Sequence, residues 1–414
     1  MRAIELFAGG GGLALGIQRA GFRHLALIEN DHDACDTLRA NSGSAKGATR
    51  LRQQGWPIWE GDARDYPYER HAGKIHLLVG GPPCQPFSIG GKHTGNSDTR
   101  NLFPIMLDAV RRLLPQAVLI ENVKGLAREA FLPYLEYIVW RLRFPAEAMR
   151  FGESWLDHKE RLAHIALSGG HPDVEYQIMG PQILNLVDYG APQARERLFL
   201  VALRADLDLT WEWPEPTHSR SALLHEQWVS GVYWRRHRLR QPAPPFSVAA
   251  AVRRLQDTPR PASKPWRTVR DALRGLPEPV DYQPHPTIAN HIGIPGARSY
   301  YGHSGSLYDA PAKTLKAGDH GVPGGENMLL RDDGTVRYFT VRESARLQTF
   351  PDEYVFCGSR TEAMRQIGNA TPVIVAELLS RQLFNLLKPI NRRAARPSRD
   401  SFLPQESLFE LDIA

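Results

Sequence analysis

Apolar and polar positions recur with two alternating periods over the first half of the chain. Short apolar runs have the length of buried strands, and the segments between them carry apolar residues at helical spacing. We expect strands at 4–7, 25–28, 75–79 and 117–120, and helices at 13–20, 33–40 and 102–114. Strands that alternate with helices predict an α/β fold with a doubly wound, mostly parallel sheet.

The pattern becomes irregular in the middle of the chain. Segments 177–187 and 197–203 are expected to be later strands, antiparallel at the edge of the sheet. Residues 205–310 are rich in Pro, Arg, Trp and His, and only 266–276 predicts a short helix there, so a separate irregular lobe is expected. Helical spacing returns at 340–348 and 373–387.

Composition sets the class of protein. The 414 residues are 42% hydrophobic and 23% charged, which is typical of a soluble globular chain. No apolar run approaches the roughly 20 residues that span a membrane, and no signal peptide precedes the first strand. The three cysteines lack metal-site spacing, so we expect no metal, no disulfide framework and a cytoplasmic location. A net charge of +6 favours a polyanionic partner.

Cys84 lies in an unusual local setting. Pro82 and Pro83 precede it on a stiff turn, directly after the strand expected at 75–79 and Gly80-Gly81. Open α/β sheets bind ligands at the carboxyl ends of their strands. The position favours a reactive thiol over the alternative, a buried core cysteine.

A glycine-rich turn, Phe7 to Gly12, follows the first strand. Gly9 to Ala14 fits the G-x-G-x-x-A pattern, in which backbone amides approach a ligand closely. Glu29 lies about 20 residues further on, where an acid can bind ribose hydroxyls. Asp62 follows the end of a third expected strand and can accept from an adenine amino group. The turn alone does not separate NAD from other adenosine-containing cofactors, and each acid alone fits a solvated loop carboxylate.

Acidic and basic groups also follow the later strands. Glu121 comes after the strand at 117–120 and can face Cys84 across the sheet edge, although Asn122 suggests a helix cap as an alternative. Gln193, Arg195 and Arg197 share one face if they lie on a strand. Two guanidinium groups on one face repel each other unless an anion lies between them, which suggests a binding site. The alternative is that these residues form an ordinary charged segment on the surface.

Together these motifs resemble the DNA (cytosine-5)-methyltransferase family, of the bacterial restriction-modification type. The matching motifs, in chain order, are Phe7–Gly12, Gly80–Ser88, Glu121–Val123, Gln193–Arg197, Arg342–Gln348 with Phe350–Asp352, and Gln366–Ala370. Thr371 departs from the pattern, because an aliphatic residue is usual there, and we expect little effect from the exchange. The resemblance implies a Rossmann-like methyltransferase sheet and S-adenosylmethionine as the cofactor.

The resemblance also implies roles for individual residues. Phe7 would pack on the adenine, the glycine turn would hold the amino-acid end of the cofactor, Glu29 the ribose and Asp62 the adenine amino group. Asn369 would close the pocket. The expected cofactor-binding residues are Phe7, Ala8, Gly9, Gly11, Gly12, Glu29, Asp62, Pro83 and Asn369.

The implied chemistry uses four residues. The thiolate of Cys84 would add to carbon 6 of cytosine and so activate carbon 5 for methylation. Glu121 would hydrogen-bond the ring nitrogen and amino group, Arg197 would hold the ring oxygen, and Arg195 would orient the cysteine or a phosphate. The sequence does not identify the base that removes the proton from carbon 5; water is one candidate.

A cytosine stacked in a duplex must be flipped out to reach such a pocket. Ser88, Lys92 and Arg100 are the expected phosphate contacts of a closing loop, and an ordinary flexible loop is the alternative. Arg235, Arg236 and Arg238 belong to a basic cluster suited to contacts with the DNA backbone.

The implied domains are a catalytic domain at 1–204 completed by 362–388, a target-recognition domain with hinge at 205–361, and a disordered tail at 389–414.

The sequence also suggests partners for this protein and other functions that it could have. Gln405, Ser407, Leu408 and Phe409 resemble a peptide that docks on the bacterial sliding clamp, against the alternative of a plain tail. A restriction endonuclease for the same site, a monomeric state and association with the bacterial nucleoid are also expected.

Three other functions fit the motifs less well. The long lobe at 205–310 argues against a tRNA cytosine methylase, and intact Cys84, Glu121 and Arg197 argue against a silent DNA-binding regulator. An NAD oxidoreductase would leave Cys84 and Gln193–Arg197 unexplained.

Overall fold

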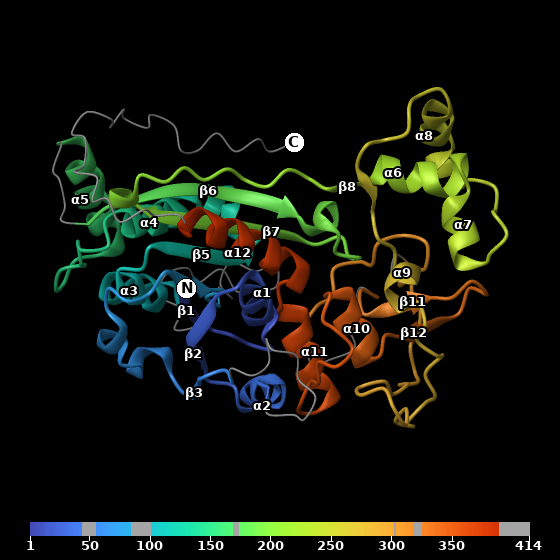
Figure 1. Ribbon diagram of the computed structural model, residues 1–414, viewed down its shortest axis with the longest axis horizontal. Coiled ribbons are helices and arrows are strands. Elements are labelled where there is room, and N and C mark those ends of the chain that lie inside the picture. Colours follow the sequence, from blue (N-terminus) through green and yellow to red (C-terminus); the bar gives the residue numbers. More distant parts are fainter. Residues whose placement is uncertain (44–54, 84–100, 169–173, 302–303, 318–324, 389–414) are drawn as a thin grey trace.

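The structure is a computed structural model that describes residues 1–43, 55–83, 101–168, 174–301, 304–317 and 325–388 (Figure 1). It has a large sheet domain and a smaller lobe to one side, which Figure 1 shows at the right. The described residues contain no helix long and apolar enough to cross a membrane.

A seven-stranded sheet forms the centre of the large domain, in the order β3-β2-β1-β4-β5-β7-β6. Strands β1 to β5 are parallel, and β7 runs antiparallel between β5 and β6. The strands are β1 (Arg2–Leu6), β2 (Arg23–Glu29), β3 (Ile58–Glu60), β4 (Leu77–Gly80), β5 (Ala117–Val123), β6 (Tyr176–Asn185) and β7 (Glu196–Arg204). The carboxyl ends of β1, β2, β4 and β5 therefore meet at one edge.

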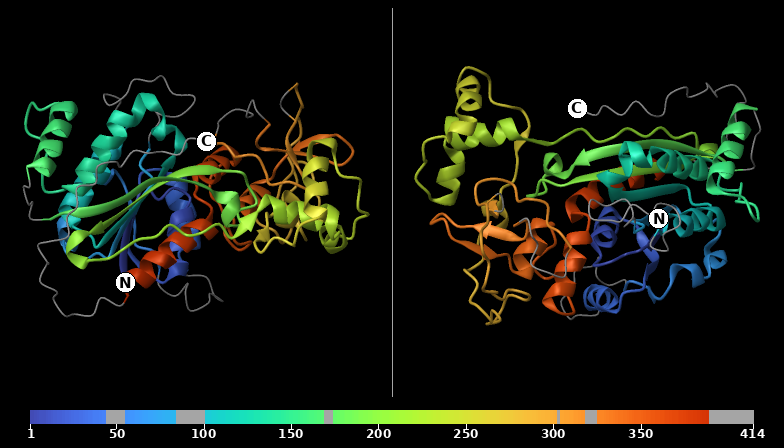
Figure 2. Two further views of the ribbon diagram at one scale, coloured as in Figure 1. Left: turned by 90° about the horizontal axis from the view of Figure 1, so that it is seen from above. Right: turned by 180° about the vertical axis from the view of Figure 1, so that it is seen from behind.

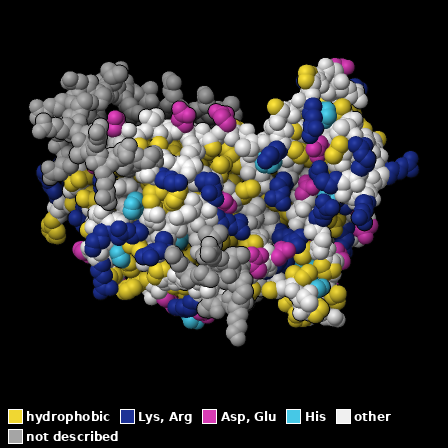
Figure 3. Space-filling view, viewed as in Figure 1, with side chains coloured by type: hydrophobic (Ala, Val, Ile, Leu, Met, Phe, Trp, Pro, Cys, Tyr) yellow, Lys and Arg dark blue, Asp and Glu magenta, His cyan; other side chains and the backbone are white. Residues whose placement is uncertain are grey.

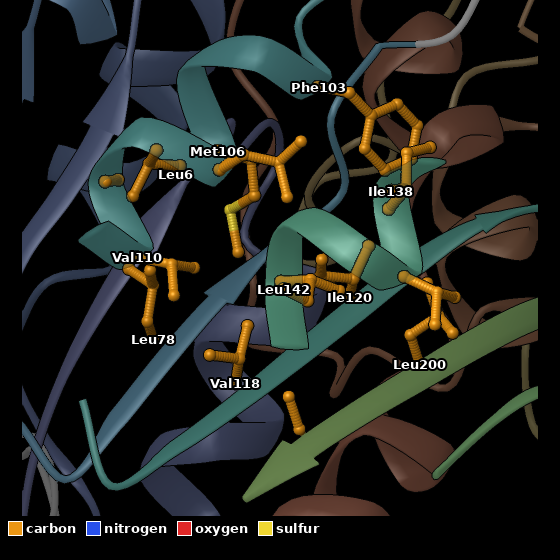
Figure 4. Packing of buried hydrophobic residues seen from close by; sticks show 14 of the residues in the cluster. Leu6, Leu78, Phe103, Met106, Val110, Val118, Ile120, Ile138, Leu142 and Leu200 are labelled. Atoms are coloured by element: carbon orange, nitrogen blue, oxygen red, sulfur yellow. The ribbon is translucent and has the colours of Figure 1, made fainter. Parts of the chain in front are cut away.

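Helices cover both faces of this sheet (Figure 2). They are α1 (Gly12–Ala20), α2 (His32–Asn41), α3 (Phe103–Leu113), α4 (Leu132–Arg143), α5 (Trp155–Leu167) and α12 (Val373–Leu387). Alternate residues of one strand point to opposite faces, so Leu78 packs with α3 and α4 while Val79 packs with α1 and α12. Figure 4 shows the first of these cores, with Met106 and Val110 of α3 against the sheet.

Helix α12 brings the end of the described chain back to its beginning. It packs against α1 so closely that a Cβ on Gly16 would lie 2.4 Å from the Cβ of Ala376. Glycine at position 16 therefore allows the two helix backbones to approach. The C-terminal segment therefore packs directly on the first helix of the sheet domain.

The smaller lobe has few and short elements. They are β8 (His218–Ser219), α6 (Arg220–Leu224), α7 (Val232–His237), α8 (Phe246–Gln256), β9 (Lys264–Pro265), α9 (Val269–Leu273), β10 (Ser306–Leu307), β11 (Met328–Leu330) and β12 (Val336–Tyr338). A small core forms where Leu223, Tyr233 and Trp234 pack with Trp228 and Trp266. The lobe thus has an apolar core of its own, although a small one.

A third group of elements joins the lobe to the sheet domain. Helices α10 (Val341–Leu347) and α11 (Arg360–Asn369) share a core with α9 on one side and with Leu27 and Leu38 on the other. Trp211 also packs on the large domain, in the core that contains α12. The predicted domain boundaries at 204 and 361 therefore fall within continuous packing.

The elements expected within residues 1–204 are confirmed, including the antiparallel β7 near the sheet edge. The sequence analysis did not identify α4, α5, α8 or α11. Helix α5 buries only His158 and Leu162, so it carries almost no apolar stripe that a periodicity argument could detect.

Candidate active site

The glycine turn lies between β1 and α1 and has an unusual backbone. Phe7, Gly9 and Gly11 all adopt positive φ, at 59°, 51° and 82°. A Cβ on Gly11 would lie 2.4 Å from the Tyr354 hydroxyl, and one on Gly12 would lie 2.5 Å from the Thr371 carbonyl oxygen. These two glycines are therefore required by the close approach of the C-terminal segment. Nothing lies within 4 Å of such a Cβ on Gly9, so a ligand can approach there.

Glu29, at the end of β2, holds this turn in place. Its Oε2 accepts from the Gly9 amide at 2.7 Å, and its Oε1 accepts from the amides of Asn30 and Asp31, each at 2.9 Å. A carboxylate has about four lone-pair sites, so it retains capacity for another donor such as a ribose hydroxyl.

Asp62 lies just after β3, as expected, but its oxygens already have partners. One oxygen caps a short turn by accepting from the Arg64 amide at 2.8 Å, and the other pairs with the Arg64 guanidinium at 2.6 Å. Its side chain is partly exposed. These bonds use two of about four lone-pair sites of the carboxylate, and binding of an adenine amino group at Asp62 stays a prediction.

The remaining expected cofactor residues lie around the same edge. Phe7 is half-buried, Ala8 is buried and Pro83 is exposed. Asn369 is exposed at the last position of α11. The end of α11 packs against the glycine turn, and closure of the pocket by Asn369 stays a prediction.

Glu121 and Arg197 form a buried ion pair at the carboxyl end of β5. Arg197 Nε lies 3.0 Å from Glu121 Oε1, with 14% and 10% of the two side chains exposed. The pairing follows from the register, because β5 and β7 are antiparallel neighbours and place Val123 opposite Arg197. Burial raises the pKa of Glu121, and the charges of Arg197 and Arg195 oppose that rise.

Arg195 is fully buried, and no carboxylate among the described residues forms an ion pair with it. Its guanidinium donates to the carbonyls of Leu315 at 3.2 Å and Gly368 at 2.7 Å. Burial lowers its pKa, as does the neighbouring Arg197 charge, whereas Glu121 raises it. Glu121 is thus the acidic group near both guanidinium groups. A DNA phosphate has no access to so buried a group, which favours an orienting role for Arg195 over a phosphate contact.

The expectation that Gln193, Arg195 and Arg197 share a strand holds only for Arg197. Strand β7 begins at Glu196, and Gln193 makes an isolated bridge to Ala312 instead. All three side chains are nevertheless largely buried, so a surface charge run is excluded.

Asn122 does not cap a helix, so that alternative is wrong. It lies within β5, and its Nδ2 donates to the Pro82 carbonyl at 2.9 Å. On the same turn, a Cβ on Gly81 would lie 3.3 Å from Glu121 Oε2. Gly81 and Pro82, which lead to position 84, are therefore held directly against the end of β5 that carries the Glu121–Arg197 pair.

Four expected site residues, Cys84, Ser88, Lys92 and Arg100, lie outside the described residues. The other two cysteines can be assessed. Burial raises the pKa of the Cys35 thiol to about 12, and it also raises that of Cys357. Neither thiol is poised to act as a nucleophile near neutral pH.

Thr371 is a site residue whose importance the sequence analysis missed. It is 3% exposed, and its side chain lies close enough to the Glu121 carboxylate to lower the pKa of that carboxyl group. The departure from the motif pattern was the available signal. Thr371 gives Glu121 a polar neighbour, which the aliphatic residue usual at this position would not provide.

The basic residues expected to contact DNA lie on and after α7 in the smaller lobe. Arg235 and Arg238 are exposed, and Figure 3 shows Lys and Arg side chains gathered over this lobe. Arg236 differs, because it pairs with Glu226 at 2.8 Å and Asp271 at 3.3 Å. The structure therefore gives Arg236 a role in holding the lobe together.

Comparisons with known proteins agree with this geometry. The profile of the C-5 cytosine-specific DNA methylase family matches residues 1–143 and 172–385. Type II methyltransferase M.NgoMIV of Neisseria gonorrhoeae is 30% identical over 400 residues, covering 94% of this chain and 99% of that protein. Type II methyltransferase M.Eco47II of Escherichia coli is 29% identical over 398 residues, covering 94% of this chain and 80% of that protein.

A solved structure shows the same fold. The Dnmt2 methyltransferase of S. pombe superposes with a TM-score of 0.54 at 18% identity, covering 94% of this chain and 99% of that one. The likeness extends through both the sheet domain and the smaller lobe.

Proposed function

The chain belongs to the C-5 cytosine-specific DNA methylase family, and from this premise we propose which of its residues carry the reaction. It is a DNA (cytosine-5)-methyltransferase, which transfers a methyl group from S-adenosylmethionine to carbon 5 of cytosine in duplex DNA. The observation that supports the residue assignment is the buried Glu121–Arg197 pair, held beside the turn that leads to Cys84.

Cys84 is the proposed nucleophile. A free thiol has a pKa of about 8.5, so a nearby positive charge is needed to populate the thiolate near neutral pH. Arg195 and Arg197 supply such charge at this edge, because a guanidinium group stays protonated in proteins. The sulfur–carbon 6 bond forms as the ring double bond opens, and carbon 5 becomes the nucleophile. After methylation a base removes the carbon 5 proton, the double bond re-forms and the thiolate leaves.

Glu121 acts on the ring nitrogen. Burial favours its neutral form, which can donate a hydrogen bond, or a proton, to the nitrogen as negative charge develops there. Arg197 holds the ring oxygen and fixes the carboxyl group, while Arg195 orients the strand start and the thiolate. A preorganised donor of this kind stabilises charge more strongly in a site from which water is excluded.

The glycine-turn region fits S-adenosylmethionine. The open space at Gly9 and the spare acceptor capacity of Glu29 suit the amino-acid end and the ribose of such a ligand. Phe7, Ala8, Gly11, Gly12, Asp62, Pro83 and Asn369 complete the proposed binding set. When bound, this cofactor supplies a methyl group made electrophilic by the sulfonium.

The smaller lobe is the proposed target-recognition domain. Exposed Arg235 and Arg238 are suited to the DNA backbone, which they would hold while the target base is flipped out. Ser88, Lys92 and Arg100 are proposed as phosphate contacts. We keep the division into 1–204 with 362–388, 205–361 and 389–414, supported by the packing of α12 on α1.

The cellular partners are proposals that follow from the relatives. Because the relatives are type II methyltransferases, we propose a restriction endonuclease that acts on the same site. A monomeric enzyme and docking of Gln405–Phe409 on the sliding clamp are further proposals. The peptide 403–411 tests the latter, since no anisotropy shift with a bacterial clamp up to about 1 mM would reject it.

Bisulfite sequencing of DNA from cells that express the chain tests the activity and reveals the target sequence. A duplex with 5-fluorocytosine at that target then tests the mechanism, because the fluorine cannot leave as a proton does. We expect a trapped protein–DNA adduct at Cys84 in the presence of the methyl donor. Methylation of tRNA without methylation of DNA would instead support the RNA-directed alternative.

A further inference from the structure

Three segments from distant parts of the sequence meet at a buried polar junction. They are the residues before β7 (193–195), the segment 315–317, which follows β10 of the smaller lobe, and the end of α11 (367–370). Gln193, Arg195 and Gln348 hold these segments together, and each is 0% exposed. We call these three side chains the polar junction.

The first contacts of the polar junction cap the end of α11. Gln348 Nε2 donates to the carbonyls of Ile367 at 2.6 Å and Ala370 at 3.0 Å, and Arg195 donates to the carbonyl of Gly368 at 2.7 Å. The last carbonyls of a helix have no partner within the helix, and a buried one left without a donor is costly. The negative end of the α11 dipole also stabilises the buried Arg195 cation.

The second contacts reach the smaller lobe. Gln193 Nε2 donates to Gln348 Oε1 at 3.2 Å, while Gln193 Oε1 accepts from the Leu315 amide at 2.9 Å. Arg195 donates to the Leu315 carbonyl. The donor and the acceptor of the Gln193 side-chain amide are thus both used to join Leu315 to Gln348.

The end of α11 also contacts the cofactor side. A Cβ on Gly10 would lie 3.0 Å from Gln366 Cβ, and one on Gly12 would lie 2.5 Å from the Thr371 carbonyl oxygen. On the opposite side, a Cβ on Gly368 would lie 2.3 Å from the Ala317 amide nitrogen. The last turn of α11 is therefore packed between the glycine turn and the segment 315–317.

We propose that Gln193 and Gln348 are positioning residues that couple cofactor binding at the glycine turn to DNA binding by the smaller lobe. The inference rests on the proposed function, in which these two sites bind S-adenosylmethionine and duplex DNA. A ligand that orders the end of α11 from one side reduces the cost of ordering it from the other. Such coupling is reciprocal, and typical values are about 5- to 150-fold in affinity.

The test measures duplex affinity by fluorescence anisotropy with and without saturating S-adenosylhomocysteine, the non-reactive product. The coupling factor is the ratio of the two dissociation constants. Gln348→Met and Gln193→Met keep side-chain length but remove the hydrogen bonds of the polar junction. Gln227→Met is a matched control, because Gln227 is also buried and donates to the Asp309 carbonyl at 2.7 Å, away from the junction.

We expect a wild-type coupling factor of at least about fivefold, falling to about twofold or less in both junction variants. Gln227→Met should keep the wild-type factor. If the two residues had a purely structural role, the variants would raise both dissociation constants by the same factor, or lower the melting temperature. The coupling factor would then stay at the wild-type value.

A wild-type factor near one, or an unchanged factor in the junction variants, would overturn the proposal. If Gln348→Met fails to fold, Gln193→Met decides, because it keeps the bonds from Gln348 and Arg195 to the last carbonyls of α11 and removes only the bonds of Gln193 to Gln348 and to the Leu315 amide. Failure of the proposed function is separate, since a chain without that function would bind neither ligand and would leave DNA unmethylated.

Discussion

The sheet domain and the smaller lobe stabilise their folds in different ways. The sheet domain has two large apolar cores, one on each face, and its charged site residues lie at the ends of strands. The lobe core contains few residues, and ion pairs such as Arg270 with Asp309 and Arg337 with Glu343 join its short elements. A rigid scaffold suits groups that must meet reacting atoms, whereas the lobe presents a surface to the DNA.

The sharpest test of this contrast removes the proposed nucleophile from the sheet domain. Cys84→Ala should lower turnover by about 10⁴-fold or more, because no other group supplies the bond to carbon 6. The affinity for S-adenosylhomocysteine, measured by calorimetry, should stay near the wild-type value. Methylation retained in this variant would contradict the mechanism.

A second substitution tests the carboxyl group alone. Glu121→Gln keeps the shape of the side chain but cannot transfer a proton, so kcat should fall by about 10²–10⁴-fold. The affinity for duplex DNA should change little, because we assign DNA binding mainly to the smaller lobe. A loss confined to DNA binding, measured by anisotropy, would mean that Glu121 serves recognition and not chemistry.

The same contrast explains what the sequence could predict. Strands and helices of residues 1–204 show clear periods, and sheets place functional groups at strand ends, so Glu29, Glu121 and the glycine turn were placed correctly at one edge. The polar junction was not predictable, because Arg195 and Gly368 are 173 positions apart and no local pattern relates them. The helix cap at Asn122, which was the alternative interpretation, is wrong because Asn122 lies within β5.

Within the lobe, two neighbouring arginines should behave differently. Arg236→Ala leaves the buried Glu226 without its close partner and should destabilise the lobe by about 1–3 kcal/mol, seen as a lower melting temperature. Arg235→Ala should leave stability unchanged and weaken DNA binding, reducing the salt slope by about one. Equal effects of the two substitutions on salt dependence would show that Arg236 also contacts the DNA.

The smallest expected effect concerns Thr371, where the C-terminal segment contacts the sheet-domain site. Its hydroxyl stabilises the charged form of Glu121, so Thr371→Val should raise the pKa of that carboxyl group further. The proposed mechanism needs the neutral acid, and activity is therefore lost as pH rises through this pKa. The alkaline limb of the kcat profile should move to higher pH by about 0.5–1 unit, the equivalent of one hydrogen bond.

Thr371→Ser is the matched control, because it keeps the hydroxyl and should restore the wild-type pH profile. A uniform loss of kcat at every pH in Thr371→Val would instead indicate a packing defect near Gly12, whose close approach to the Thr371 carbonyl oxygen leaves little room for adjustment. A shift of the limb to lower pH would mean that the ionised carboxylate is the active form. In that case Arg197 would stabilise a base, and the proton on the ring nitrogen would have to come from another donor.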